Sequence, residues 1–117
     1  MKENIIRDKS FNFALRIVKL SKFLIEKKSE YVLSKQILRS GTSIGANIEE
    51  AIGGQSKKDF LNKISIAYKE ARETDYWLRI LEGSGYIDKK MYNSLSKDCE
   101  ELMKILGSIK KTILRNK

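Results

Sequence analysis

The segment between Arg39 and Ala51 constrains the fold of this chain more than any other part of it. Small and apolar residues recur there at alternating steps of four and three, which places them on one face of a helix. They are Ile37, Gly41, Ile44, Ile48 and Ala51. Glycine costs a helix interior about 1 kcal/mol relative to alanine, a cost that is tolerated where another helix must approach closely. The segment therefore predicts a tightly packed internal helix.

Polar residues at helical spacing lie beside this stripe, and they allow two interpretations. They are Ser40, Ser43, Asn47 and Glu50. One interpretation is helix packing alone. The other is a structural polar network in which Ser43, Asn47 and Glu50 meet Glu70 and Glu73 of the following helix. Buried carboxylates persist only when they are paired, so Arg39, Arg72 or Arg79 would supply the compensating charge.

Proline is absent from the 117 residues, which favours long helices with short connections. Apolar periodicity predicts four helices, over residues 8–27, 31–52, 57–82 and 89–114. We expect an all-α protein: one domain over residues 1–117, folded as an antiparallel up-down-up-down four-helix bundle. The first helix has two neighbouring apolar stripes, wider than an amphipathic helix needs. These stripes are Phe11, Ala14, Leu15 and Val18, and Phe13, Ile17, Leu20 and Leu24.

Helix ends can also be predicted from the sequence. Gly53 and Gly54 are expected to end the second helix in the left-handed conformation that glycine accepts. Ser56 precedes a Lys-Lys-Asp sequence that resembles a capping box, so it is the expected N-cap of the third helix. Asp88 is the expected N-cap of the fourth helix.

The sequence gives little indication of a catalytic site or a metal site. Histidine is absent, so Ser43 and Cys99 have no partner to activate them as nucleophiles. Glu70 and Glu73 stand three residues apart, but a di-iron bundle would pair such carboxylates with histidine. A carboxylate-only site with Glu50 is the weaker alternative. We expect no catalytic residue, no metal and no cofactor.

The net charge of +9 indicates an anionic partner, with a solvated basic surface as the alternative. No acid follows Glu101, whereas several cations do. The candidate nucleic-acid-binding residues are Lys35, Arg39, Lys110, Lys111 and Arg115. The open N–H groups at the start of the third helix, with Lys57 and Lys58, could also receive a phosphate. Four large rings lie off the main stripes, and we favour packing or subunit contacts for them over base stacking. These rings are Tyr68, Tyr76, Trp77 and Tyr92.

Targeting signals are not evident. The N-terminal residues lack the apolar run of a signal peptide, and no window approaches the roughly 20 apolar residues of a membrane span. A lone cysteine suits a reducing compartment. We therefore expect a cytoplasmic protein without a membrane partner.

Two patterns in the chain resemble the four-helix bundle family of 23S ribosomal RNA intervening-sequence proteins. The first consists of Arg39, Ser40, Ser43-Ile44, Asn47-Ile48 and Glu50. The second consists of Phe60-Leu61, Ile66-Ala67, Glu70, Glu73 and Leu78. The resemblance covers almost the whole chain. One departure is Ala51, which stands where the family commonly has glycine.

The resemblance implies an up-down bundle that assembles into a homopentameric ring with a basic surface, and no catalytic residue set. Some family members are encoded inside intervening sequences of ribosomal RNA genes. A related branch accompanies reverse transcriptases of diversity-generating retroelements and binds nucleic acid and the enzyme. We therefore expect a homo-oligomer that binds RNA or DNA electrostatically. The alternative is a protein-interaction scaffold, for example an accessory subunit of a reverse transcriptase.

Overall fold

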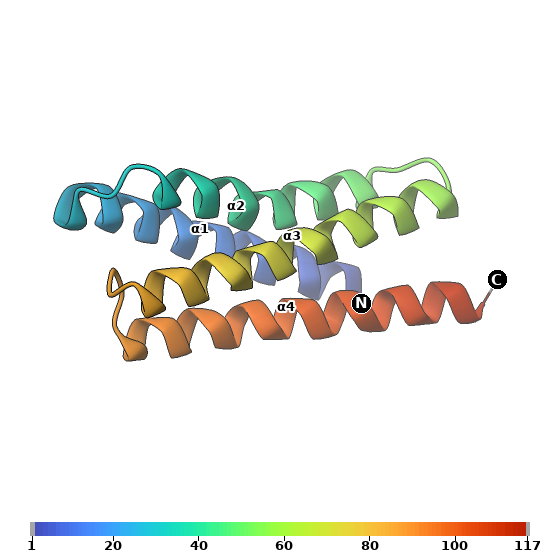
Figure 1. Ribbon diagram of the computed structural model, residues 1–117. Helices are drawn as coiled ribbons and strands as arrows, with labels where there is room; N and C mark the ends of the chain where they lie inside the picture. Colours follow the sequence, from blue (N-terminus) through green and yellow to red (C-terminus); the bar gives the residue numbers. More distant parts are fainter. Residues whose placement is uncertain (1, 117) are drawn as a thin grey trace.

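The computed structural model describes residues 2–116, with side chains from residue 5 onward, as four antiparallel helices (Figure 1). They are α1 (Lys2–Lys28), α2 (Leu33–Ile52), α3 (Lys57–Gly83) and α4 (Lys89–Arg115). Each helix packs against two others, α1 and α3 both lying between α2 and α4. The molecule measures 47 × 21 × 19 Å. The predicted all-α, up-down-up-down architecture is confirmed, and none of the described helices has an apolar stretch that could cross a membrane.

The core is built from the predicted stripe of α2 together with one apolar face each of α3 and α4. Ile37, Ile44 and Ile48 are fully buried, as are Ala71 and Leu78 of α3. The α4 stripe is buried from Leu95 to Ile109, with Cys99 among its members. The prediction for α2 is confirmed because a helix in a bundle buries whichever face is apolar, and the periodicity identifies that face.

The wide apolar face expected on α1 is only half used. Phe13 and Ile17 are buried in the core, whereas Phe11 is 61% exposed and Leu15 is 48% exposed. The reason is that α1 has helical neighbours only on its α2 and α4 sides, so its outer face has nothing to pack against within one chain. We call Phe11, Leu15 and Ile25, all exposed, the outer stripe of α1.

The two glycines of α2 both face α1 at short distance. A Cβ added to Gly41 would come within 2.8 Å of Ile17, and one added to Gly45 would lie 3.4 Å from Ser10 Oγ. The contact at Gly41 is too short for a real carbon atom. The predicted close approach of another helix is therefore confirmed, and the partner is α1.

Two of the predicted helix ends are confirmed, and the reason given for a third was wrong. Ser56 Oγ accepts the Asp59 N–H at 3.1 Å, and Asp88 accepts the Met91 N–H at 2.8 Å. Helix α2 does end at Ile52, but Gly53 has φ −82° and is not left-handed. Its N–H still bonds the Glu49 carbonyl at 3.1 Å, so the helix closes without the left-handed residue.

The connection between α1 and α2 contains a cap that the sequence did not reveal. The Glu30 carboxylate accepts N–H bonds from Val32, Leu33 and Ser34, at 3.2, 3.0 and 2.7 Å. Glu30 is only 8% exposed. Burial by itself would raise the pKa of Glu30, but these bonds to its charged form outweigh it and the pKa lies below 4.5. The residue stabilises the start of α2 as an anion at a helix N-terminus.

Candidate nucleic-acid interface

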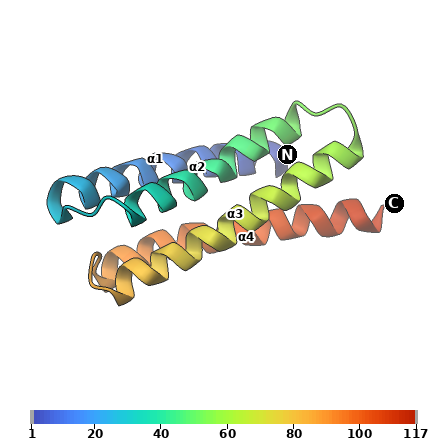
Figure 2. The same ribbon diagram turned by 45° about the horizontal axis from the view of Figure 1, so that its top comes forward.

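Cations from two helices gather at one end of the bundle. The start of α3 lies beside the end of α4 (Figures 1 and 2), and Lys57, Phe60 and Ile113 line a common hollow there. Lys58 and Leu114 line a second hollow of about 510 Å³. We call the cations of these two helix ends the basic end. They are Lys57, Lys58, Lys110, Lys111 and Arg115.

None of the five cations of the basic end forms an ion pair among the described residues, and Asp59 is the acid in the first turn of α3. Two acids at the end of α2 already have other partners: Glu49 pairs with Arg7 at 2.7 Å and Glu50 with Lys63 at 2.8 Å. The positive potential is therefore available to an anion, and the open N–H groups of α3 add to it.

The structure does not bring the two parts of the predicted nucleic-acid site together. Lys35 lies near the start of α2, at the end of the molecule opposite Lys110 and Lys111 (Figure 1). Arg39 contacts two carboxylates, Glu70 at 3.1 Å and Glu73, and its pKa is raised chiefly by the bond to Glu73. A guanidinium that is already paired attracts a phosphate less than a lone one. Lys110, Lys111 and Arg115 are therefore the stronger candidates.

Arg39 organises a smaller polar network than the sequence predicted. Glu73 accepts from both Arg39 and the Trp77 ring N–H, the latter at 2.9 Å, and these bonds lower the pKa of Glu73. The bond from Trp77 lowers the pKa of Glu73 most, and burial of the carboxylate opposes this lowering. Of the three arginines considered as counter-charges, Arg39 fills the role, whereas Arg79 pairs with Asp75 at 3.6 Å.

The other predicted members of the network have different partners. Ser43 Oγ donates to the Arg39 carbonyl at 2.6 Å, Asn47 Nδ2 donates to the Ser43 carbonyl at 2.8 Å, and Glu50 pairs with Lys63. The antiparallel register explains this, because residues late in α2 face residues early in α3. Asn47 and Glu50 consequently fall short of Glu70 and Glu73 by about one turn or more.

A buried hydroxyl pair between α2 and α3 was missed by the sequence reasoning. Ser40 Oγ and Thr74 Oγ1 lie 2.9 Å apart, and both residues are fully buried. Thr74 also bonds the Glu70 carbonyl at 2.8 Å. The available signal was a threonine in an otherwise apolar α3 stripe, opposite a serine on α2. The pair favours the observed register of the two helices, since a one-residue slip would break the bond between the two hydroxyls and leave each with only a carbonyl of its own helix.

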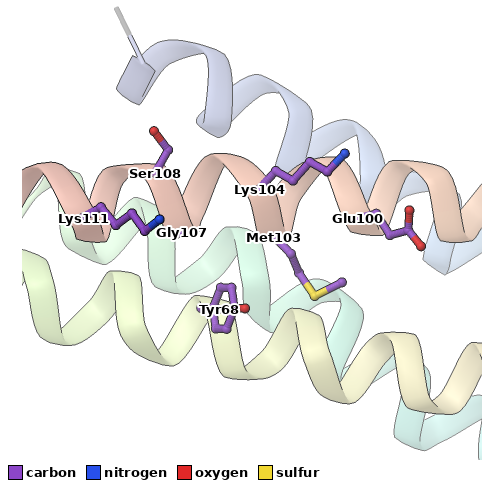
Figure 3. Close-up of a pocket in the computed structure, with 7 residues that line it drawn as sticks. All are labelled: Tyr68, Glu100, Met103, Lys104, Gly107, Ser108 and Lys111. Carbon is purple, nitrogen blue, oxygen red and sulfur yellow. The ribbon is translucent and has the colours of Figure 1, made fainter.

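A groove of about 600 Å³ runs between α3 and α4 (Figure 3). Tyr68 reaches into it from α3, below Gly107 and Met103 of α4. Lys104 and Lys111 line its sides, together with Glu100 and Ser108. The Lys110 ammonium lies 5.4 Å from the centre of the Tyr68 ring. The sequence did not show this groove because Tyr68 and the α4 residues become neighbours only in the folded bundle.

The remaining large rings behave differently from Tyr68. Tyr76 and Trp77 pack edge to face with centroids 5.3 Å apart, and Arg79 lies 5.6 Å from the Tyr76 ring. Tyr76 is 47% exposed, whereas Tyr92 is partly buried against the core. Within this group, Tyr76 is the ring left most open to solvent or to another subunit.

The potential nucleophile Cys99 is deeply buried. Its thiol contacts the Ala71 carbonyl at 3.2 Å, and burial raises its pKa to about 12. A thiol at such a pKa is not a nucleophile at neutral pH. Among the residues that the structure describes, no three histidine, cysteine, aspartate or glutamate side chains cluster as metal ligands.

The sequence model of the 23S rRNA-intervening sequence protein family matches residues 2–108. The chain belongs to this family. A protein of unknown function from the S23 ribosomal protein family of Bacteroides thetaiotaomicron has a similar crystal structure, with a TM-score of 0.94. It is 56% identical in sequence, and the match covers 95% of this chain and 99% of that one. No curated protein matches the chain. The two patterns on α2 and α3 thus identified the intervening-sequence protein family correctly.

Proposed function

We propose that this intervening-sequence family protein is a non-enzymatic, cytoplasmic homo-oligomer that binds RNA or DNA through its basic end. The observation that carries the proposal is the cluster of cations from α3 and α4 that have no acidic partner among the described residues. The acid-free last turns of α4 give the cluster its charge. Lys35 and Arg39 are secondary sites, the first at the far end of the bundle and the second paired with carboxylates.

Binding of this kind is mainly electrostatic. Each phosphate that a lysine or arginine neutralises releases counterions, which makes the affinity fall steeply with salt. The described surface has no motif for reading base sequence in a duplex, so phosphate contacts would dominate and sequence preference would be weak. One basic end offers few contacts. A ring of subunits, expected as a pentamer from the family resemblance, would present several at once and raise the avidity.

The outer stripe of α1 supports self-association. Phe11 and Leu15 stand four residues apart with 61% and 48% of their surfaces exposed, and Ile25 continues the stripe at 40%. An apolar stripe on a charged protein is typical of a surface that another protein covers. The outer stripe belongs to α1 and the basic end to α3 and α4, so the two surfaces lie on different helices.

Fluorescence anisotropy with labelled structured RNA and duplex DNA tests the proposal. Affinity should fall by orders of magnitude between about 50 and 200 mM salt. The double variant Lys110→Glu, Lys111→Glu should weaken binding strongly and reduce the salt slope. The matched control is Lys89→Glu, Lys90→Glu, which makes the same charge change at the other end of α4. Absence of wild-type binding at the lowest salt, or equal losses in both double variants, would contradict the assignment to the basic end.

The alternative is a scaffold for another protein, such as a reverse transcriptase with an acidic surface. The outer stripe of α1 is the observation that favours it. One set of measurements distinguishes the two functions. If the protein is a scaffold, it should not bind nucleic acid at low salt, and the outer stripe should remain exposed in the purified protein.

A further inference from the structure

We propose that the groove between α3 and α4 binds one unstacked base of a single-stranded nucleic acid against Tyr68, with neighbouring phosphates on Lys104 and Lys111. The inference rests on the proposed nucleic-acid binding and makes it specific, because it selects single strands over duplexes. Three features of the groove carry it: the unfilled space at Gly107, the position of the Tyr68 ring, and the placement of the charges.

Gly107 lies inside α4, and the fold of the chain does not require a glycine there. A Cβ added at Gly107 would meet only Tyr68 Cε2, at 3.9 Å, which is ordinary van der Waals contact. At Gly41, by contrast, the same addition would collide with Ile17. Glycine weakens a helix interior relative to alanine. The cost at Gly107 is therefore not explained by packing within the chain, and what the glycine leaves is a methyl-sized gap beside Tyr68, at the wall of the groove.

Tyr68 is placed as a stacking surface. It is partly buried, so the ring is held by α3 and α4, and it also reaches the groove (Figure 3). The Lys110 ammonium lies over the ring and adds a cation–π contact, a kind of contact that arginine contributes in single-strand binders. Met103 and Gly107 give the groove an apolar wall of the kind that the face of a base requires.

The charges of the groove fit a polyanion that passes through it. Lys104 and Lys111 stand seven residues apart on α4, which is about two helical turns and 10 Å along the axis. A ribose-phosphate chain could therefore contact both while its base turns inward to Tyr68. Glu100, the acid that lines the groove, lies beyond Lys104 and would repel phosphates from that end. The strand would then continue toward Lys110, Lys111 and the basic end.

A duplex does not meet these requirements, because its base faces are covered by their neighbours in the stack. A duplex would contact the lysines only through phosphates. Single strands offer free base faces, and stacking on an aromatic side chain is tolerant of sequence. The proposal consequently predicts a preference for single strands that phosphate contacts alone would not produce.

The test compares a labelled 12-nucleotide oligouridylate, oligothymidylate of the same length and a duplex of the same length, at one salt concentration and across a salt series. Tyr68→Leu should weaken single-strand binding about 10-fold without changing the salt slope, since stacking releases no counterions. Gly107→Leu should weaken it similarly by filling the groove. Tyr68→Phe should bind like wild type, and duplex affinity should be unchanged in all three variants.

The outcomes separate this inference from the proposed function. If Tyr68→Leu and Gly107→Leu bind single strands like wild type while Lys110→Glu, Lys111→Glu does not, the basic end stands and the groove proposal is overturned. If Gly107→Leu instead changes the oligomer mass with unaltered affinity, the space at Gly107 belongs to a neighbouring copy, which also overturns it. Absence of any wild-type binding overturns both. Helix content by circular dichroism checks that each variant is folded.

Discussion

Gly41 of α2 faces Ile17 of α1 with no room for a side chain, because a Cβ on Gly41 would lie 2.8 Å from both Ile17 Cγ atoms. Those atoms branch directly from the Ile17 Cβ and cannot swing away without moving α1. Overpacking of this kind costs about 1–3 kcal/mol, against about 1 kcal/mol of gained helix propensity. Gly41→Ala should therefore lower the free energy of unfolding by about 1 kcal/mol, measured by urea denaturation.

Gly107→Ala is the matched control for that prediction. It makes the same chemical change inside a helix, but the new Cβ would meet only Tyr68 Cε2, at 3.9 Å. Helix propensity then acts alone and should raise the free energy of unfolding by about 1 kcal/mol. If both substitutions shift stability in the same direction, the close contact between α1 and α2 does not have the energetic role assigned to it.

The Glu30 cap makes stability depend on pH in a defined direction. Its folded-state pKa lies below the ordinary 4.5, so the stabilisation is complete above pH 4.5 and is lost as the pH falls through the lower, folded-state pKa. Glu73 shifts in the same direction and adds to the effect. Urea denaturation at a series of pH values should show stability falling below pH 4.5.

Substitutions at Glu30 test the origin of that loss. Glu30→Ala should cost about 1–2 kcal/mol at pH 7, as the removal of other N-terminal caps does. Glu30→Gln keeps an acceptor oxygen without the charge and should lower the free energy of unfolding by less. In this variant, stability should also fall less steeply as the pH is lowered below 4.5. If the free energy of unfolding of Glu30→Gln falls with decreasing pH as steeply as that of wild type, the pH dependence belongs to other carboxylates.

Glu73 and Asn47 should respond differently to substitution, although both were predicted members of one network. Glu73→Gln weakens the contacts with Arg39 and Trp77, and we expect a loss of about 1 kcal/mol because the group is partly exposed. Asn47→Ala removes only a bond within α2, to the Ser43 carbonyl, and alanine favours the helix. Thermal unfolding should show a lower midpoint for the first variant and no decrease for the second.

Cys99 should be protected from thiol reagents in the folded protein. Burial and a pKa of about 12 leave almost no thiolate at pH 8. Reaction with a disulfide reagent should consequently proceed at the rate at which the bundle opens and should become fast in denaturant. Rapid modification of the native protein would show that the contact between α3 and α4 around Ala71 opens readily.

The outer stripe of α1 should control assembly rather than folding. The double substitution Phe11→Ser, Leu15→Ser changes two exposed residues, so helix content and the unfolding transition of the subunit should be largely preserved. The molar mass measured by light scattering should fall. A mass equal to that of wild type would mean that subunits contact one another through a different face.

Much of the fold could be predicted because it depends on periodicity and local capping. The stripe from Ile37 to Ala51 and the caps at Ser56 and Asp88 need only residues close in sequence. Contacts between helices were harder to predict from the sequence, because the register of α2 against α3 decides which polar groups meet. That register assigns Glu50 to Lys63 and joins Arg39 to Glu73.

The candidate site was only partly predictable for the same reason. The cations at the end of α4 are visible as a run without acids, but their juxtaposition with Lys57 and Lys58 requires the antiparallel fold. The groove combines Tyr68 of α3 with Gly107 of α4, which are far apart in the chain. The Glu30 cap was hidden because Glu30 lies two residues before Val32, the N-cap of α2, and therefore outside the usual capping position.

The cations that α3 and α4 place side by side also affect the stability of the unbound protein. Like charges at Lys57 and Lys58 repel those at Lys110 and Lys111, and so oppose the docking of the last turns of α4 against α3. A polyanion that binds there would remove this repulsion and stabilise the native state in proportion to its occupancy. Folding and ligand binding are thereby linked: the end of the bundle that attracts the partner is the end whose order the partner should increase.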